Sequence, residues 1–189
     1  MNKAFWNDVA SKGAILGLMM LVSHIFELAM MLNGDMGRMG IVGAEMIVVF
    51  GLYVYLLFRF TKRYSQQFSQ EEGFTFGKGF SYVLTLSIFT SVVVGLGGYI
   101  FTHLIIGYEQ YINGIVNLYT NILSAAQLPS QMIGTYEQMI ERIAEQPEPS
   151  IFTAITSSMW GYTFLGVFAG LIIAGIVKRE PNIFSNDNN

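Results

Sequence analysis

The sequence predicts an all-α membrane protein with four transmembrane helices and an extracytoplasmic amphipathic helical hairpin between helices three and four. The first observation is composition: 52% of the 189 residues are hydrophobic and only 12% are charged, whereas soluble domains carry about 25% charged residues. The second is that four long stretches are almost free of charge. The third is that the basic residues gather in the segments that share one side of the membrane in such an arrangement.

Each charge-poor stretch is long enough to cross a bilayer, which needs about 20 mostly apolar residues. We place the four spans within a single domain of residues 1–189, at about 13–32, 39–58, 79–107 and 151–177. Lys3 and Lys12 precede the first apolar run, as in a signal peptide. That run is too long, however, and no small-residue cleavage site follows it, so we expect an uncleaved first span.

The composition excludes several classes of site and partner. The chain contains no cysteine, so it has no disulfide, thiol nucleophile or thiolate metal site. A net charge of −3 does not indicate a nucleic-acid partner.

The basic residues predict the orientation, since lysines and arginines favour the cytoplasmic side. Only Arg38 and Arg142 belong to the predicted outer loops. The other eight of the ten basic residues lie in the two terminal segments or between spans two and three: Lys3, Lys12, Arg59, Lys62, Arg63, Lys78, Lys178 and Arg179. We therefore expect both termini in the cytoplasm.

The segment 108–146 separates spans three and four and reads as two amphipathic helices. Its apolar residues recur at intervals of three and four, which is typical of amphipathic helix. A break is predicted at Leu128-Pro129, with Ser130 as the next N-cap, and Pro147 and Pro149 are expected to end the second helix. The hairpin is expected either to cover the outer end of the bundle or to dock a partner.

Four ionisable side chains fall in the predicted spans, all in the outer half of the bilayer: His24, Glu27, Glu45 and His103. His24 and Glu27 are about 60° apart around a helix, on the face that also carries Gly13 and Gly17. Charged groups inside a membrane are costly and are functional candidates. We therefore take these four as a candidate intramembrane polar site.

Several interpretations of this polar set stay open. The first two are a structural polar cluster and a site that handles protons or cations. The other two are a metal site with histidine and carboxylate ligands and a bis-histidine haem site through His24 and His103. Its ligand types suit zinc, but the sequence lacks the His-Glu-x-x-His pattern. The metal and the cofactor therefore remain unknown, and no catalytic residue is assigned.

Small residues at four-residue spacing predict where helices approach closely. Gly13 and Gly17 form one such pair in the first span, and Gly166 and Gly170 form another in the fourth. We expect these pairs to pack helices within the fold, or, for the fourth span, to join copies of the chain in a homo-oligomer.

The stretch EEGFTFGKGFSYVLTLSIFTSVVVGLGGYI (71–100) resembles an uncharacterised Bacteroidota family of short four-span integral membrane proteins, known only as a domain of unknown function. The similar features are a basic loop that leads into span three at Phe76-Gly77-Lys78, and a polar helical segment before span four. The resemblance implies the fold and a location in the inner membrane of a bacterium. It also implies an accessory role in envelope glycan assembly, beside a polyprenyl-phosphate glycosyltransferase.

Three functions are consistent with the sequence. The first is a non-enzymatic accessory or scaffold protein, favoured by the small size, the short loops and the lack of a catalytic motif. The second is a small oligomeric transporter or proton- or cation-coupled carrier that uses the four polar residues. The third is a metal-dependent intramembrane enzyme, which requires those residues to converge. A cavity lined by all four favours the second or third, and a dry, packed bundle favours the first.

Overall fold

The computed structural model describes residues 3–32, 36–125 and 130–182. These residues form six α-helices and one π-helix. In chain order the elements are α1 (Lys3–Met31), α2 (Met36–Ser65), α3 (Phe76–Tyr99), the π-helix η1 (Ile100–Ile106), α4 (Tyr108–Ala125), α5 (Ser130–Ala144) and α6 (Ile151–Val177).

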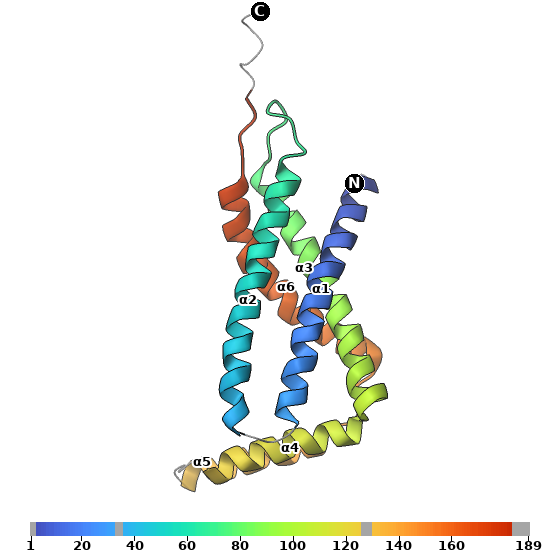
Figure 1. Cartoon of the computed structure of the whole chain (residues 1–189), viewed down its shortest axis with the longest axis vertical. Helices are drawn as coiled ribbons and strands as arrows, with labels where there is room; N and C mark the ends of the chain where they lie inside the picture. Colours follow the sequence, from blue (N-terminus) through green and yellow to red (C-terminus); the bar gives the residue numbers. More distant parts are fainter. Residues whose placement is uncertain (1–2, 33–35, 126–129, 183–189) are drawn as a thin grey trace, which may run out of the picture.

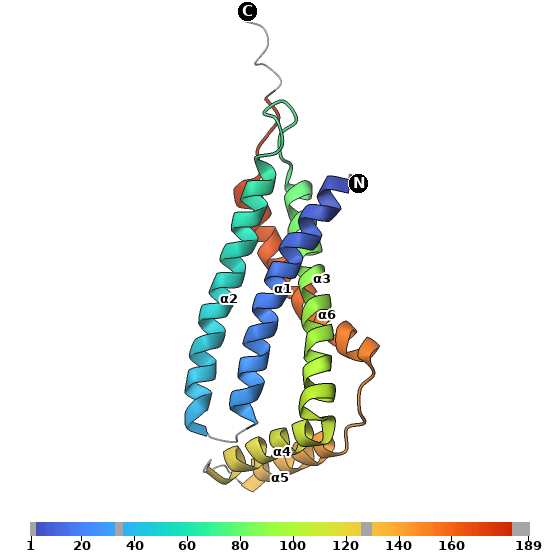
Figure 2. The ribbon, with the colours of Figure 1, turned by 45° about the vertical axis from the view of Figure 1, so that its right-hand side comes forward.

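Four of these helices form a bundle along the long axis of the molecule, and α4 and α5 lie across one end of it (Figure 1). The start of α1 and the end of α6 lie at the other end of the bundle (Figures 1 and 2). Within the described residues, α1, α2, α3 continued by η1, and α6 are the helices long and apolar enough to span a membrane. The predicted all-α class, the four spans and the position of the helical pair are therefore confirmed.

Three of the four spanning helices begin earlier or end later than the charge-poor stretches from which we predicted the spans, whereas α6 has the predicted bounds. α1 begins at Lys3 rather than near residue 13, because its first turns bury Val9 and half-bury Phe5 in the core. Phe5 packs edge-on against Tyr82 of α3, with ring centroids 6.1 Å apart. Hydropathy therefore located the apolar part of each helix. Packing at the end of the bundle where α1 begins extends some of the helices beyond that part.

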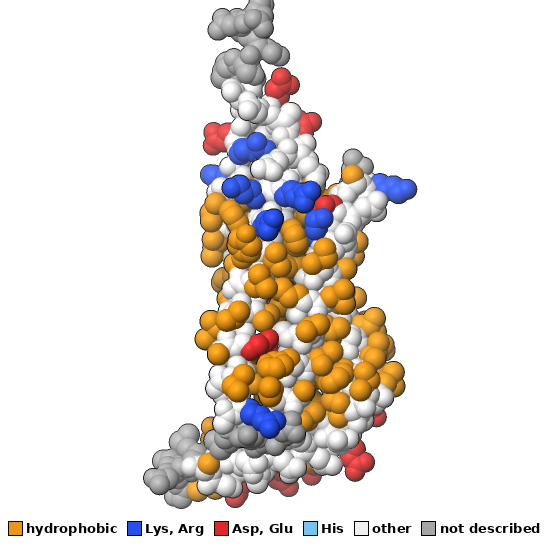
Figure 3. All heavy atoms as spheres, viewed as in Figure 1, with side chains coloured by type: hydrophobic (Ala, Val, Ile, Leu, Met, Phe, Trp, Pro, Cys, Tyr) orange, Lys and Arg blue, Asp and Glu red, His pale blue; other side chains and the backbone are white. Residues whose placement is uncertain are grey.

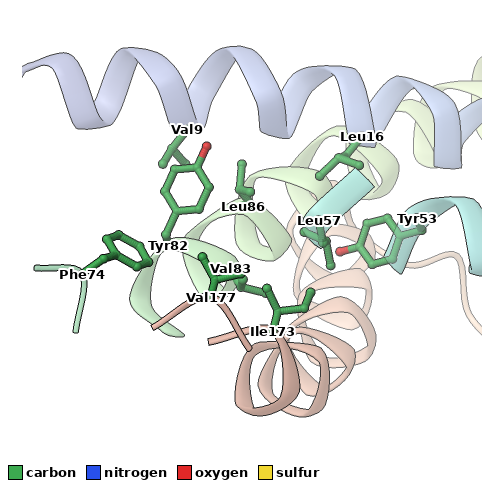
Figure 4. Close-up of a cluster of buried hydrophobic side chains, with 10 residues drawn as sticks. All are labelled: Val9, Leu16, Tyr53, Leu57, Phe74, Tyr82, Val83, Leu86, Ile173 and Val177. Carbon is green, nitrogen blue, oxygen red and sulfur yellow. The ribbon is translucent and has the colours of Figure 1, made fainter. Parts of the chain in front are cut away.

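The core of the bundle is filled by large side chains from all four long helices (Figure 4). Tyr53, Leu57, Tyr82 and Leu86 are each 0–1% exposed. Tyr53 donates a hydrogen bond to Ser87 Oγ at 3.1 Å, which satisfies its hydroxyl away from water. This part of the bundle is closely packed.

The predicted packing glycines lie where helices meet. A Cβ built on Gly13 would be 2.5 Å from Phe89 Cβ, and one on Gly17 would be 2.5 Å from Val93 Cβ, both on α3. On α6, Gly166 and Gly170 also face α3, where they lie against the side chains of Ser87 and Phe80. α3 is thus the central helix, with α1 on one face and α6 on another.

The helical pair α4–α5 is an antiparallel hairpin that caps the bundle. Tyr108, at the start of α4, donates hydrogen bonds to the carbonyl oxygens of Gln146 and Pro147, just beyond α5. In the middle of α4, Leu118 is 1% exposed, and Gly114 leaves room for the side chain of Leu32 at the end of α1.

Two details of the hairpin prediction have different outcomes. The second helix ends at Ala144, two residues before the predicted bound of 146, and Pro147 and Pro149 follow in the linker to α6. The predicted break at Leu128-Pro129 lies outside the described residues, and the same holds for the Ser130 side chain.

The opposite end of the molecule is tied together by the α2–α3 loop and the segment after α6. Phe74 and Arg179 exchange backbone hydrogen bonds of 2.9 and 2.8 Å, and the Arg179 guanidinium donates to the Ser65 carbonyl. Gly73 adopts a φ of +59°, and a Cβ there would lie 2.7 Å from the Pro181 nitrogen. A side chain at this position would therefore be disfavoured both by its backbone conformation and by lack of space.

Candidate functional site

A cavity, called the vestibule below, lies at the hairpin end of the bundle beside the end of α3 and η1. α6 runs antiparallel to α3, and a Cβ on Gly95 would be 2.8 Å from Ile155 Cα. α6 begins at Ile151, which is about one turn before Ile155. Because the two helices are antiparallel, α6 packs beside α3 only as far as about Tyr99 and does not extend along η1. Residues 146–150 of the linker, together with Tyr108 and Tyr111 of α4, line the space instead.

The vestibule has a volume of about 760 Å³, within the usual range of about 300–1,000 Å³ for small-molecule sites. Both histidines of the chain line it, His24 from α1 and His103 from η1. Much of the remaining polar lining comes from α3, α4, the linker and α6, including Tyr99, Tyr108, Tyr111, Glu148, Ser150 and Ser157.

The π-helix η1 determines how His103 is held. We expected regular helix through this segment, but Ile100–Ile106 forms a π-helix, a rare conformation that is frequent at functional sites. His103 Nδ1 lies 3.0 Å from the Tyr99 carbonyl oxygen and 2.8 Å from Thr102 Oγ1. A carbonyl oxygen only accepts hydrogen bonds, so Nδ1 carries a hydrogen and donates it.

The His103 ring is enclosed on both faces by tyrosines. Its centroid lies 4.0 Å from that of Tyr99 and 5.1 Å from that of Tyr108, with the rings nearly parallel. Only 6% of its side chain is exposed, and Nε2 lies 3.8 Å from Glu148 Oε1. Nε2 is buried and has no hydrogen-bond partner within the part of the chain that the structure describes.

The tyrosines of α4 present neutral hydroxyls to this end of the vestibule. Burial, and then the charge of Glu148, raise the pKa of Tyr108 above its ordinary value. Burial, followed by its neighbours Tyr108 and Tyr119, raises the pKa of Tyr111 as well. Both shifts favour the protonated phenol, so these side chains stay uncharged at neutral pH and act as hydrogen-bond donors and aromatic walls.

His24 reaches the vestibule across the α1–α3 interface. Its Cδ2 and Nε2 atoms lie 3.4 and 3.5 Å from the position that a Cβ would take on Gly98. The ring is half-buried, so Gly98 provides the space in which the imidazole lies against α3. His24 and His103 therefore line one cavity although 78 residues separate them in the chain.

Glu27 and Glu45 come together at a second place, between α1 and α2. Ser23, which is 5% exposed, donates to Glu45 Oε1 at 2.7 Å and lies 3.4 Å from Glu27 Oε1. Glu45 Oε2 is buried without a hydrogen-bond partner in the described ranges. An acidic side chain is visible within the hydrophobic band of the bundle (Figure 3).

The four predicted residues thus divide into two pairs. The histidines face the vestibule, whereas the two glutamates share the hydroxyl of Ser23. In residues 3–32, 36–125 and 130–182, no three histidine, aspartate or glutamate side chains are grouped so that they could hold a metal ion. The geometry therefore does not fit a metal centre built from all four residues.

A family model described as "Protein of unknown function (DUF4199)" matches residues 12–179. The chain belongs to the DUF4199 family. This agrees with the resemblance to an uncharacterised four-span family drawn from residues 71–100. No curated protein and no solved structure matches the chain.

Other residues of this DUF4199 chain belong to the two polar places, and sequence reasoning missed them. Ser23 and Glu148 are two such residues that contact the predicted ones directly. Ser23 directly precedes His24, but a lone serine in an apolar run carries no signal. Glu148 stands between Pro147 and Pro149, and a carboxylate on a short proline-flanked linker was a usable signal for a group with a defined position.

Proposed function

We propose that this protein is a non-enzymatic accessory protein of the bacterial inner membrane, which binds a polar ligand in an extracytoplasmic vestibule. Both termini face the cytoplasm in this proposal, and the α4–α5 hairpin lies outside. The support is the distribution of charge: lysines and arginines gather where the hydrophobic band ends near the chain termini, and the side chains visible on the hairpin are mainly acidic (Figure 3). Basic residues favour the cytoplasmic side.

The observation that carries the binding role is that the vestibule meets a packed core. Its inner wall is formed by Val94 and Gly95. One to two turns further along α3, Ser91, Thr90 and Ser87 are each 0% exposed. Thr90 and Ser87 donate to carbonyl oxygens of their own helix, so these hydroxyls do not supply a polar path. A cavity that is open at one end and blocked by packing at the other suits binding better than passage.

The chain offers a direct accessibility test because it has no cysteine. Ser157→Cys, at an exposed vestibule position, should react with a membrane-impermeant maleimide added outside intact spheroplasts. Thr90→Cys, in the packed core, should not react. Ser81→Cys, at the exposed start of α3, should react only after permeabilisation. Labelling of Ser81→Cys from outside, or protection of Ser157→Cys in both conditions, would refute the proposal.

A second candidate function is an oligomeric proton- or cation-coupled carrier, and the Ser23–Glu27–Glu45 contact favours it. Its polar atoms lie between two spans, and the buried Glu45 Oε2 lacks a partner among the described residues. The test is Glu27→Gln, which keeps the size of the side chain. If Glu27→Gln leaves ligand binding in the vestibule unchanged, the binding role is supported. If the variant folds and inserts but loses function, the carrier is supported.

The predicted partner is a polyprenyl-phosphate glycosyltransferase, an assignment implied by the family resemblance. The exposed acidic side chains of the hairpin, such as Glu137 and Glu141, provide a surface for such contact. Pull-down in mild detergent followed by mass spectrometry tests it, with the double variant Glu137→Gln/Glu141→Gln as the comparison. Recovery of the enzyme with the wild type and not with the variant is expected, and equal recovery with both would refute a role for this surface.

A further inference from the structure

The vestibule contains a buried imidazole nitrogen that faces a carboxylate and has no hydrogen-bond partner among the residues that the structure describes. His103 Nδ1 donates to the Tyr99 carbonyl oxygen, so in the neutral ring Nε2 carries a lone pair and accepts. Nε2 faces Glu148 Oε1 at 3.8 Å, and a carboxylate also accepts. Two acceptors at this separation are both satisfied by a ligand that donates several hydrogens and carries a positive charge.

The surroundings of these two acceptors also favour a cation. Tyr108 and Tyr111 line the vestibule, and their ring faces carry the negative side of the aromatic quadrupole. A cation within about 6 Å of such a face is attracted to it. Glu148 is 60% exposed, so its carboxylate stays hydrated at the entrance and can receive a ligand from outside.

A neighbouring part of the lining, which begins two residues after Glu148 in the chain, combines hydroxyl groups with the N-terminus of a helix. Ser150 is the N-cap of the 27-residue helix α6, and it lines the vestibule with Thr153 of the first turn. The Thr153 N–H donates to the Ser150 side chain at 3.1 Å, so an anion here is attracted by the helix dipole and by the other N–H groups that are free at a helix N-terminus. The hydroxyls of Ser157 and Ser158, also in the lining, add donors along the same helix.

From these two neighbouring parts of the lining we propose that the vestibule binds a phosphoethanolamine group, with its ammonium between His103 and Glu148 and its phosphate at the start of α6. This assignment rests on the proposed function, since it names the ligand of the same cavity. The positive charge of the group matches His103 and Glu148, and its negative charge matches the start of α6. The volume of about 760 Å³ exceeds what the head group alone requires. Phosphatidylethanolamine in the outer leaflet and soluble phosphoethanolamine are the two sources of this chemistry.

The amine predicts a ranking among lipids. Phosphatidylglycerol lacks a cation and places only negative charge near Glu148. Phosphatidylcholine has a quaternary ammonium that donates no hydrogen bond to Nε2. Hydrogen bonds to charged groups contribute about 1.5–3 kcal/mol, so we expect phosphatidylethanolamine to be retained at least about tenfold more strongly than either.

The test is native mass spectrometry of the delipidated protein with equal amounts of the three lipids. Glu148→Gln should lower phosphatidylethanolamine retention about tenfold to the level of the other two lipids. Glu148 lies on the exposed linker, so this variant is expected to fold. Glu145→Gln, a neighbouring exposed carboxylate outside the vestibule lining, is the matched control and should behave as the wild type.

Soluble phosphoethanolamine added to the lipid-bound protein distinguishes the two sources. If phosphoethanolamine displaces the lipid at a concentration similar to that of the lipid, the free compound is the ligand. If the lipid stays bound, phosphatidylethanolamine is the ligand. Both results support the assigned chemistry. Equal retention of all three lipids, or no effect of Glu148→Gln, would overturn the assignment. If another lipid is retained and released by His103→Ala, the vestibule still binds a ligand and only the amine is wrong.

Discussion

A methyl group added at Gly166 should separate α3 from α6, whereas the same methyl at Gly175 should not. A Cβ on Gly166 would lie 2.6 Å from Ser87 Cβ, while carbon atoms prefer about 3.5–4.0 Å. The shortfall is about 1 Å, and Ser87 Cβ is bonded directly to the α3 backbone, so rotation of a side chain cannot relieve it. The helices must move apart, or the Tyr53–Ser87 hydrogen bond of 3.1 Å must be disturbed.

The size of the effect follows from two opposing contributions. Overpacking of this kind costs about 1–3 kcal/mol, and replacing a helical glycine by alanine contributes up to about 1 kcal/mol of helix propensity. Gly175 has no atom within 4 Å of its Cβ position, so Gly175→Ala has only the favourable contribution. The difference between the two variants therefore isolates the overpacking of about 1–3 kcal/mol.

The assay is thermal unfolding of both variants in one detergent, followed by tryptophan fluorescence and by size-exclusion chromatography of heated samples. For a chain of this size, about 1 kcal/mol corresponds to about 2–4 °C in Tm. The Tm of Gly166→Ala is expected to be lower than that of Gly175→Ala by about 2–4 °C for each kcal/mol of overpacking. A Tm for Gly166→Ala equal to or above that of Gly175→Ala would refute the assigned close contact of α3 and α6.

Three further perturbations test other contacts. Gly17→Ala places a methyl 2.5 Å from an α3 side chain and should lower the free energy of unfolding by about 1–3 kcal/mol, measured by the same melting assay. Tyr108→Phe removes the two hydrogen bonds that close the hairpin onto its linker; we expect faster amide hydrogen exchange in α4 and α5, and a loss of about 0.5–1.5 kcal/mol. Ser23→Ala removes the hydroxyl that the two carboxylates share and should destabilise the α1–α2 contact by about 1–3 kcal/mol, measured as a lower Tm.

Each of these has a matched control. Gly43→Ala on α2 has open space around the Cβ position, so it should not lower the Tm. Equal decreases in Tm for Gly17→Ala and Gly43→Ala would contradict the packing argument. Tyr119→Phe on α4 should leave hairpin exchange unchanged. Ser11→Ala, at an exposed position of α1, should leave the Tm unchanged, and so would Ser23→Ala if the shared hydroxyl contributed nothing.

The linear sequence determined the class of this protein and the order of its elements. Spans are readable because a helix in lipid must be apolar over about 20 residues, and this constraint acts within one segment at a time. The helical hairpin was readable for a similar reason, since its apolar residues repeat with the period of a helix. The helix-facing glycines Gly13 and Gly166 are also local signals, as small residues at regular spacing.

Only the tertiary structure decided which polar residues share a site. His24 and Glu27 are three residues apart, yet the first faces α3 and the second lies with Glu45 beside α2. The vestibule exists because α6 begins opposite Tyr99 while η1 continues beyond it. That offset depends on the antiparallel register of α3 and α6, which is set by contacts such as Gly166 against Ser87. A register between segments about 80 residues apart is a property of packing, so no local pattern in the sequence specifies it.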